Sequence, residues 1–139
     1  MASWSVQSNF EAAPTVDLTG LRILVVEDTW HVGEALADML RLLRAEVSGP
    51  VATVAEAEQL ISDRVPDLAI VDFTLRGREE ADGLVTRLNN LGVHVIVISG
   101  REVLPASVTA VAAILKKPFT DSQLVDSLRS SIVRKSSRQ

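Results

Sequence analysis

The sequence predicts an α/β protein built on an open parallel sheet with helices on both of its faces. Short apolar segments alternate with helical patterns at intervals of about twenty-two residues. Segments such as 23–26 and 68–71 are continuously apolar, which is typical of strands that are covered on both faces. Five such units in about 115 residues favour an open sheet, because an eight-stranded barrel would need roughly twice that length.

The first two units have clear boundaries. A strand is predicted over 23–26, and the helix after it carries an apolar stripe formed by Val32, Leu36, Met39, Leu40 and Leu43. A second strand is predicted over 46–51. Thr53 and Glu56 then form a T-x-x-E capping box, which predicts that the next helix begins there.

The remaining units repeat this pattern. Strands are predicted over 68–71, 93–98 and 112–115. A polar loop over 73–82 precedes a short helix over about 84–91, and another helix is predicted to begin near Pro105. Thr120 is expected to cap the last helix, whose apolar stripe consists of Leu124, Val125, Leu128 and Ile132.

The chain of 139 residues has the length of one domain. Residues 1–20 show no regular period and are interpreted as an N-terminal arm that is flexible or docks on a surface. Residues 21–134 are assigned to the domain itself, and residues 135–139 to a basic tail that frays.

Composition narrows the classes of function. The net charge of −4 argues against a nucleic-acid binder, which usually has a basic face. The absence of cysteine excludes disulfides and thiolate zinc sites, and it fits a cytoplasmic protein. No apolar run is long enough to span a bilayer and the first residues do not resemble a secretory signal, so no association with a membrane is expected.

Residues suited to chemistry follow four of the predicted strands. They are Glu27 and Asp28 after the first strand, Asp72 after the third, Ser99 and Gly100 after the fourth, and Lys117 after the fifth. Ligands of such sheets bind beyond the carboxyl ends of the strands, so we expect these residues to share one site. Each residue alone would more often be a helix cap or a solvated turn residue, and it is their combination that indicates a site.

These groups suit the transfer of a phosphoryl group. Carboxylates that lie close together repel one another, and Mg²⁺, which prefers oxygen ligands, relieves that repulsion. The metal would neutralise charge on an incoming phosphoryl group while one carboxylate attacks phosphorus. The Lys117 ammonium and the Ser99 hydroxyl could hold the other phosphoryl oxygens, and Gly100 leaves room for backbone N–H groups.

Four segments resemble the receiver domains of bacterial two-component response regulators. Residues 22–28, Arg-Ile-Leu-Val-Val-Glu-Asp, are similar to the first strand and acidic pair of that family, and residues 68–72, Leu-Ala-Ile-Val-Asp, to the strand carrying its phosphoacceptor. Residues 95–100, Val-Ile-Val-Ile-Ser-Gly, and 115–119, Leu-Lys-Lys-Pro-Phe, resemble the strand ending in its switch hydroxyl and its Lys-Pro signature. The resemblance covers about residues 21–133 and implies a flavodoxin-like sheet of order 2-1-3-4-5.

The resemblance also implies a role for each site residue. Asp72 would be the phosphoacceptor. Mg²⁺ would be bound by Glu27, Asp28, Asp72 and the backbone carbonyl of Thr74, with Asp28 favoured over Glu27 as a direct ligand. The phosphoryl group would be engaged by Ser99, Gly100 and Lys117.

The sequence departs from the family pattern at three places. Ile114 occupies the position, three residues before Lys117, where receivers often carry an aromatic switch residue. The loop after Asp72 reads Phe-Thr-Leu-Arg-Gly and lacks a proline that is common there, and Gly100 replaces a more frequent alanine. We expect phosphorylation to survive these departures, whereas an aromatic rotamer switch at Ile114 is not expected.

We expect a single-domain response regulator, because a helix-turn-helix output module would need tens of residues after 133. It would not be an enzyme, and it would signal by conformational change or by dimerisation. The implied phosphodonor is a sensor histidine kinase; some stand-alone receivers work with phytochrome-type kinases, an option that the sequence does not select. A homodimer is predicted through the fourth helix (segment 103–111) and the fifth, in which Leu124, Leu128 and Ile132 would form an apolar seam with a charged rim.

Two other classes of function remain open. A phosphatase of the haloacid dehalogenase type also uses an aspartate nucleophile and magnesium, but it usually has a second acidic residue where this sequence has Thr74. A flavin or nucleotide carrier could use the same fold. The glycine-rich loops that cradle phosphates in such carriers are absent from the sequence.

Overall fold

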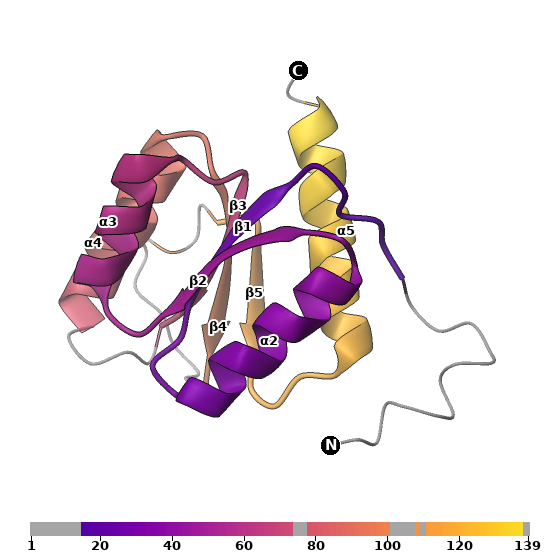
Figure 1. Ribbon diagram of the computed structural model, residues 1–139, viewed down its shortest axis with the longest axis horizontal. Coiled ribbons are helices and arrows are strands. Elements are labelled where there is room, and N and C mark those ends of the chain that lie inside the picture. Colours follow the sequence, from indigo (N-terminus) through magenta and orange to yellow (C-terminus); the bar gives the residue numbers. More distant parts are fainter. Residues whose placement is uncertain (1–14, 74–77, 101–107, 109–110, 138–139) are drawn as a thin grey trace.

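The computed structural model describes residues 15–73, 78–100, 108 and 111–137, and it describes side chains in 15–73, 81–100, 108 and 111–132. Five parallel strands form one sheet of order β2-β1-β3-β4-β5 (Figure 1). The strands are β1 (Arg22–Val26), β2 (Glu46–Val51), β3 (Leu68–Asp72), β4 (His94–Ser99) and β5 (Ala113–Lys116). The flavodoxin-like order implied by the family resemblance is therefore confirmed.

Helices cover both faces of this sheet. They are α2 (Trp30–Leu42), α3 (Val54–Asp63), α4 (Arg78–Asn90) and α5 (Asp121–Ser137). α3 and α4 lie against one face, and α2 and α5 lie against the other (Figure 1). The central strands β3 and β4 are buried at every residue, which explains their continuously apolar sequences. None of the helices described here is both long and apolar enough to cross a membrane.

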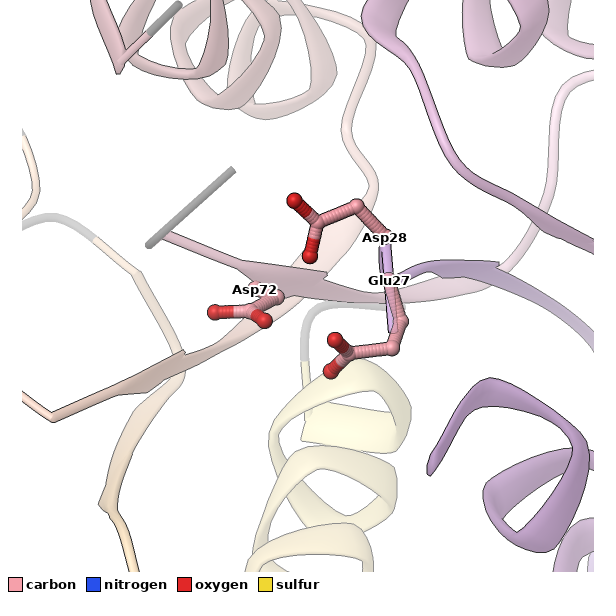
Figure 2. Close-up of side chains that lie close together, drawn as sticks. All are labelled: Glu27, Asp28 and Asp72. Atoms are coloured by element: carbon pink, nitrogen blue, oxygen red, sulfur yellow. The ribbon is translucent and has the colours of Figure 1, made fainter. Parts of the chain in front are cut away.

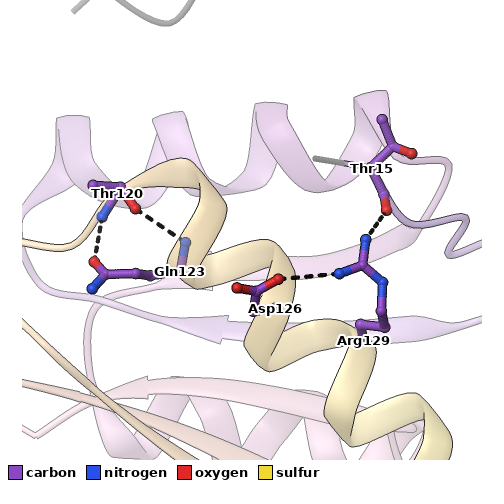
Figure 3. Close-up of polar contacts among 5 residues, drawn as sticks. All are labelled: Thr15, Thr120, Gln123, Asp126 and Arg129. Atoms are coloured by element: carbon purple, nitrogen blue, oxygen red, sulfur yellow. Dashed lines mark hydrogen bonds and ion pairs between the residues drawn. The ribbon is translucent and has the colours of Figure 1, made fainter. Parts of the chain in front are cut away.

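Two helices begin at capping boxes. The Glu56 N–H donates to the Thr53 hydroxyl at 3.1 Å, and the Thr53 N–H donates to the Glu56 carboxylate at 3.2 Å. At the start of α5, the Gln123 N–H donates to the Thr120 hydroxyl at 3.1 Å and the Thr120 N–H donates to Gln123 Oε1 at 2.8 Å (Figure 3). These bonds satisfy N–H groups that have no partner within the helix. Both predicted helix starts are confirmed.

α4 begins earlier than the sequence analysis predicted. Its first residue is Arg78, inside the segment 73–82 that was assigned to a polar loop. Phe73, at the start of that segment, is also buried. The apolar stripe of α4 consists of Ala81, Leu84, Val85 and Leu88, all buried. Its first member is a small alanine among charged residues, so the stripe was not recognised before residue 84.

α5 uses its apolar stripe to cover the sheet. Leu124 and Leu128 are fully buried, and Ile132 packs partly buried against the same core. The prediction that these side chains form an exposed dimer seam is therefore wrong, because the monomer core already contains them. α5 also extends through Ser137, into the segment 135–139 that was predicted to fray. Of the predicted partner segment 103–111, only Val108 and Val111 are described, and both are buried.

The last residues of the predicted N-terminal arm are docked on the domain. Leu18 is fully buried, and its N–H donates to the Leu43 carbonyl at 2.8 Å. Val16 packs against the core between the sheet and the α2–α5 layer. The Arg129 guanidinium on α5 donates to the Thr15 carbonyl (Figure 3). We call residues 15–21 the N-terminal strap, because they join α5 to the end of α2 before β1 begins.

Gly49 gives β2 a close approach to β1. Its φ is +104°, in the left-handed region, and a Cβ at this position would lie 2.8 Å from the Val25 carbonyl oxygen. The register between the two strands shifts between Leu24 and Val26, beside this glycine. Only a residue without a side chain fits there without displacing backbone.

Candidate functional site

Asp72 lies at the carboxyl end of the central strand β3. It is the last residue of that strand, its side chain is 1% exposed, and β1 and β4 lie on either side of it. The neighbouring Phe73 N–H donates to the Ile98 carbonyl at 2.8 Å, which extends the pairing of β3 with β4 beyond Asp72. The carboxylate is therefore held on a rigid element and away from most of the solvent.

The acidic pair after β1 lies next to Asp72. Glu27, Asp28 and Asp72 each offer a carboxylate oxygen, and these oxygens lie within 4.8 Å of one another. Figure 2 shows the three carboxylates converging from the ends of β1 and β3. Glu27 and Asp72 are buried, whereas Asp28 is exposed. The three acidic residues that the sequence placed at strand ends do share one site.

Glu27 is buried and tied to its surroundings. Its side chain is 3% exposed, and its N–H donates to the Val51 carbonyl at 2.9 Å. The Thr29 N–H donates to Oε2 of Glu27 at 3.1 Å, while Oε1 is buried without a hydrogen-bond partner. Burial raises the pKa of Glu27 from 4.5 to about 7, and the nearby Asp72 carboxylate also raises it, against smaller effects of the Thr29 N–H and Lys117.

Lys117 brings a positive charge to the site. Its Nζ lies 3.2 Å from Oδ2 of Asp72, and its side chain is 34% exposed. The Lys117 N–H donates to the Ser99 carbonyl at 2.9 Å, so the residues after β4 and β5 are joined through the backbone. Ser99 is fully buried at the end of β4, and Gly100 follows it in an exposed position.

The residues present fit a hard divalent cation. Such ions take oxygen ligands, and three carboxylates within reach of one ion supply them. The unpartnered Oε1 of Glu27 is a second sign, because a buried carboxylate oxygen without a donor is costly unless a cation or proton satisfies it. The three carboxylates, when ionised, have only the positive charge of Lys117 beside Asp72 to offset them among the contacts described. A divalent cation would therefore bring the cluster closer to neutrality.

Some of the predicted site residues are not part of this cluster. Thr74, whose carbonyl was predicted to bind metal, lies outside the described residues. Ile114 is on β5 and 44% exposed, and it is not among the three residues of the acidic cluster. Thr29 is a residue that the sequence analysis missed, because it contributes a backbone N–H and no side-chain group to the site. The available signal was its place directly after the acidic pair, at the start of a helix.

Several solved receiver domains share this fold. A response regulator receiver domain protein (CheY-like) from Methanospirillum hungatei superimposes with a TM-score of 0.76 at 23% identity, covering 86% of this chain and 98% of that one. The receiver domain of a modulated diguanylate cyclase from Desulfovibrio desulfuricans gives 0.74 at 24% identity, covering 86% and 98%. A CheY-like receiver domain from Methylobacillus flagellatus gives 0.68 at 22% identity, covering 80% and 98%.

Sequence comparison finds relatives at a higher identity than these structures. Two curated proteins from Mycobacterium tuberculosis strains, both named Transcriptional regulatory protein PdtaR, are 29% identical to this chain over 128 residues. The match covers 87% of this chain but 62% of those proteins, so the chain spans less than two thirds of their length. No family model matches the sequence.

Proposed function

Because this chain has the fold of CheY-like response-regulator receiver domains, we propose that it is a signalling receiver that accepts a phosphoryl group on Asp72. The observation that carries the proposal is the position of the Asp72 carboxylate. It is buried at a strand end, beside two further carboxylates and 3.2 Å from the Lys117 ammonium. A group in this position can act as a nucleophile while its neighbours stabilise charge on the phosphoryl oxygens.

The transfer proposed here forms a P–O bond and breaks the bond between phosphorus and its donor. An oxygen of the ionised Asp72 carboxylate attacks phosphorus, and the donor leaves with the bonding electron pair. From a phosphohistidine the leaving group is an imidazole, and from acetyl phosphate it is acetate. The product is an acyl phosphate on Asp72.

The other residues of the cluster take the roles that their positions allow. Glu27, Asp28 and Asp72 would hold Mg²⁺, which when bound offsets negative charge on the phosphoryl group. Lys117 is placed to exchange its ion pair with the Asp72 carboxylate for one with a phosphoryl oxygen. Ser99 and Gly100, at the end of β4, would provide a hydroxyl and backbone N–H groups. The Thr74 carbonyl is proposed as a further metal ligand.

The proposed phosphodonor is a sensor histidine kinase, and the proposed output is a change of shape. The modified state has contacts at Ser99 and Lys117 that the unmodified state cannot make, so phosphorylation would shift the population of conformations. Both residues continue directly into the segments after β4 and β5. These segments are therefore the proposed route by which the signal leaves the site.

The test is intact mass spectrometry of the full chain after incubation with Mg²⁺ and acetyl phosphate. We expect the mass of one phosphoryl group to be added, and Asp72→Asn to abolish the addition. Asp38→Asn, which makes the same chemical change at an exposed residue of α2, is expected to label like the parent. Equal labelling of Asp72→Asn and the parent would show that the site is wrong. Steady release of phosphate without a labelled chain would favour the phosphatase alternative.

A homodimer remains part of the proposal, with a different contact from the α5 seam. β5 is an edge strand of the sheet, and Ile114 on it exposes 44% of its surface. An edge strand presents backbone groups that a second copy could pair with, and Ile114 would lie at that contact. We expect sedimentation to show self-association that increases with phosphodonor and is lost in Ile114→Lys. A monomer mass that does not depend on concentration in either condition would leave partner binding as the readout.

A further inference from the structure

The two carboxylate oxygens of Glu27 have different surroundings. Oε2 accepts the Thr29 N–H at 3.1 Å, whereas Oε1 is buried and has no hydrogen-bond partner. The Glu27 side chain is 3% exposed. One of its carboxylate oxygens lies within 4.8 Å of carboxylate oxygens of Asp28 and Asp72. Oε2 therefore contacts the backbone at the N-cap of α2, and Oε1, which has no protein donor, is available to a cation in the acidic site.

Thr29, whose N–H donates this hydrogen bond, lies at the start of α2. Thr29 is the N-cap of α2, and its side chain makes no capping hydrogen bond. Its carbonyl accepts from the N–H groups of Val32 and Gly33, both at 3.0 Å, so the first turn is built on its backbone. By contrast, α3 and α5 begin at side-chain capping boxes. The Glu27 carboxylate thus accepts at α2 the cap N–H that the third helical residue, Glu56 or Gln123, accepts at α3 and α5.

We propose that Glu27 is a positioning residue that couples occupancy of the acidic site by a divalent cation to order in the first turn of α2. The inference rests on the proposed function in requiring that a cation be bound by the cluster. A cation that takes Oε1 as a ligand restricts rotation of the carboxylate and thereby keeps Oε2 on the Thr29 N–H. Coupling of this kind is reciprocal, so order at Thr29 also strengthens binding of the cation.

The length of the glutamate side chain matters for this coupling. An aspartate at position 27 keeps the charge but is one methylene shorter. Its carboxylate can then reach either the acidic cluster or the Thr29 N–H, but it cannot make both contacts at once as Glu27 does. Glu27→Asp therefore separates binding of the cation from the response of α2.

The experiment follows Thr29 and Trp30 in the full chain while Mg²⁺ is added. Trp30 is the first residue of α2 and is 75% exposed, and Trp4→Phe leaves it as the only tryptophan. Amide exchange at Thr29 is measured by NMR, Trp30 emission by fluorescence, and Mg²⁺ affinity independently by calorimetry. Glu34→Asp shortens a partly exposed glutamate of α2 that is not part of the acidic cluster, and it is the matched control.

We expect Mg²⁺ to slow exchange of the Thr29 amide by about fivefold or more and to change Trp30 emission in the parent and in Glu34→Asp. In Glu27→Asp, Mg²⁺ should bind while both signals stay unchanged. Should Glu27→Asp fail to bind Mg²⁺, Thr29→Pro removes the donor N–H and leaves all three carboxylates in place. That variant should bind the metal and lose the Trp30 response.

The outcomes separate this inference from the proposed function. If the parent binds Mg²⁺ and is labelled on Asp72 while Thr29 and Trp30 do not respond, the inference is overturned and the proposed function stands. A full response in Glu27→Asp or Thr29→Pro overturns it as well. Absence of Mg²⁺ binding to the parent overturns the inference together with the metal site on which it depends.

Discussion

Lys117 Nζ lies 3.2 Å from Oδ2 of Asp72, although the two residues are 45 positions apart in the chain. The contact is possible because β3 and β5 are parallel and end at the same edge of the sheet, on either side of β4. The lysine brings a positive charge to the buried Asp72 carboxylate, so it offsets part of the negative charge that the acidic site carries without a metal.

Removal of that charge should destabilise the metal-free protein. We expect Lys117→Met to lower the free energy of unfolding by about 1–3 kcal/mol, because a buried carboxylate loses its ion pair. Added Mg²⁺ should restore much of the loss and should bind more tightly than in the parent. Chemical denaturation with and without Mg²⁺ measures both effects, and Lys116→Met is the neighbouring control. A loss that Mg²⁺ does not reduce would contradict this account of the site.

Glu27 should make the metal-free protein less stable as pH rises. The unfolded chain ionises this group near 4.5 and the folded protein near 7, so between these values the folded state holds a proton that the unfolded chain has lost. The free energy of unfolding therefore falls as pH rises through this window, by at most roughly 3 kcal/mol, and stays low above it.

The measurement is the difference in denaturation midpoint between the parent and Glu27→Gln as a function of pH. The amide does not ionise, so the stability of the variant should rise relative to that of the parent as pH increases from 4.5 to 7. Mg²⁺ favours the ionised carboxylate and should reduce the difference. A difference that is constant over this window would show that the burial of Glu27 does not control its ionisation.

Phosphorylation should alter the segments that follow β4 and β5. Ser99 is fully buried and its carbonyl accepts the Lys117 N–H at 2.9 Å, so a change at either residue is transmitted to the other. We expect amide exchange over 99–119 to change by about fivefold or more when Asp72 is labelled, and Ser99→Ala to weaken the change. Full labelling with unchanged exchange in this segment would exclude this route for the signal.

Gly49 and Gly83 should respond in opposite directions to substitution by alanine. Gly49→Ala requires a left-handed backbone and places Cβ 2.8 Å from the Val25 carbonyl, so we expect a loss of about 1–3 kcal/mol. Gly83 is helical with nothing within 4 Å of a Cβ, and its substitution should stabilise α4 by about 0.5–1 kcal/mol. Thermal unfolding of the two variants compares them directly. Equal effects would mean that β2 can move away from β1.

The order of the strands was implied by the family resemblance, whereas the three carboxylates could be predicted because each depends on a short segment. Asp72 follows a continuously apolar strand, and parallel strands end at a common edge, so its position needed no knowledge of side-chain packing. The capping boxes at Thr53 and Thr120 are local in the same sense. The start of α4 was missed because its apolar stripe begins with Ala81, which carries little hydrophobic signal.

Other features depend on which surfaces meet in three dimensions. The apolar side chains of α5 could have formed a seam or a core, and periodicity alone does not distinguish the two uses. The contact of Glu27 with the start of α2 uses the backbone N–H of Thr29. Nearly every residue type has such a group, so the sequence does not reveal the contact. The burial of Leu18 was not predicted for a related reason, because a single leucine in an irregular segment gives no periodic pattern.

The burial of Leu18 sets where this domain can be joined to another protein. A fusion partner attached at residue 15 would leave the N-terminal strap intact, with Leu18 still bonded to the Leu43 carbonyl. A junction at residue 21, the position suggested by the first strand, would remove the leucine and expose the apolar layer between α2 and α5. A domain shortened in that way would also lose the hydrogen bond between Arg129 of α5 and the Thr15 carbonyl, and with it the tie between α5 and the end of α2.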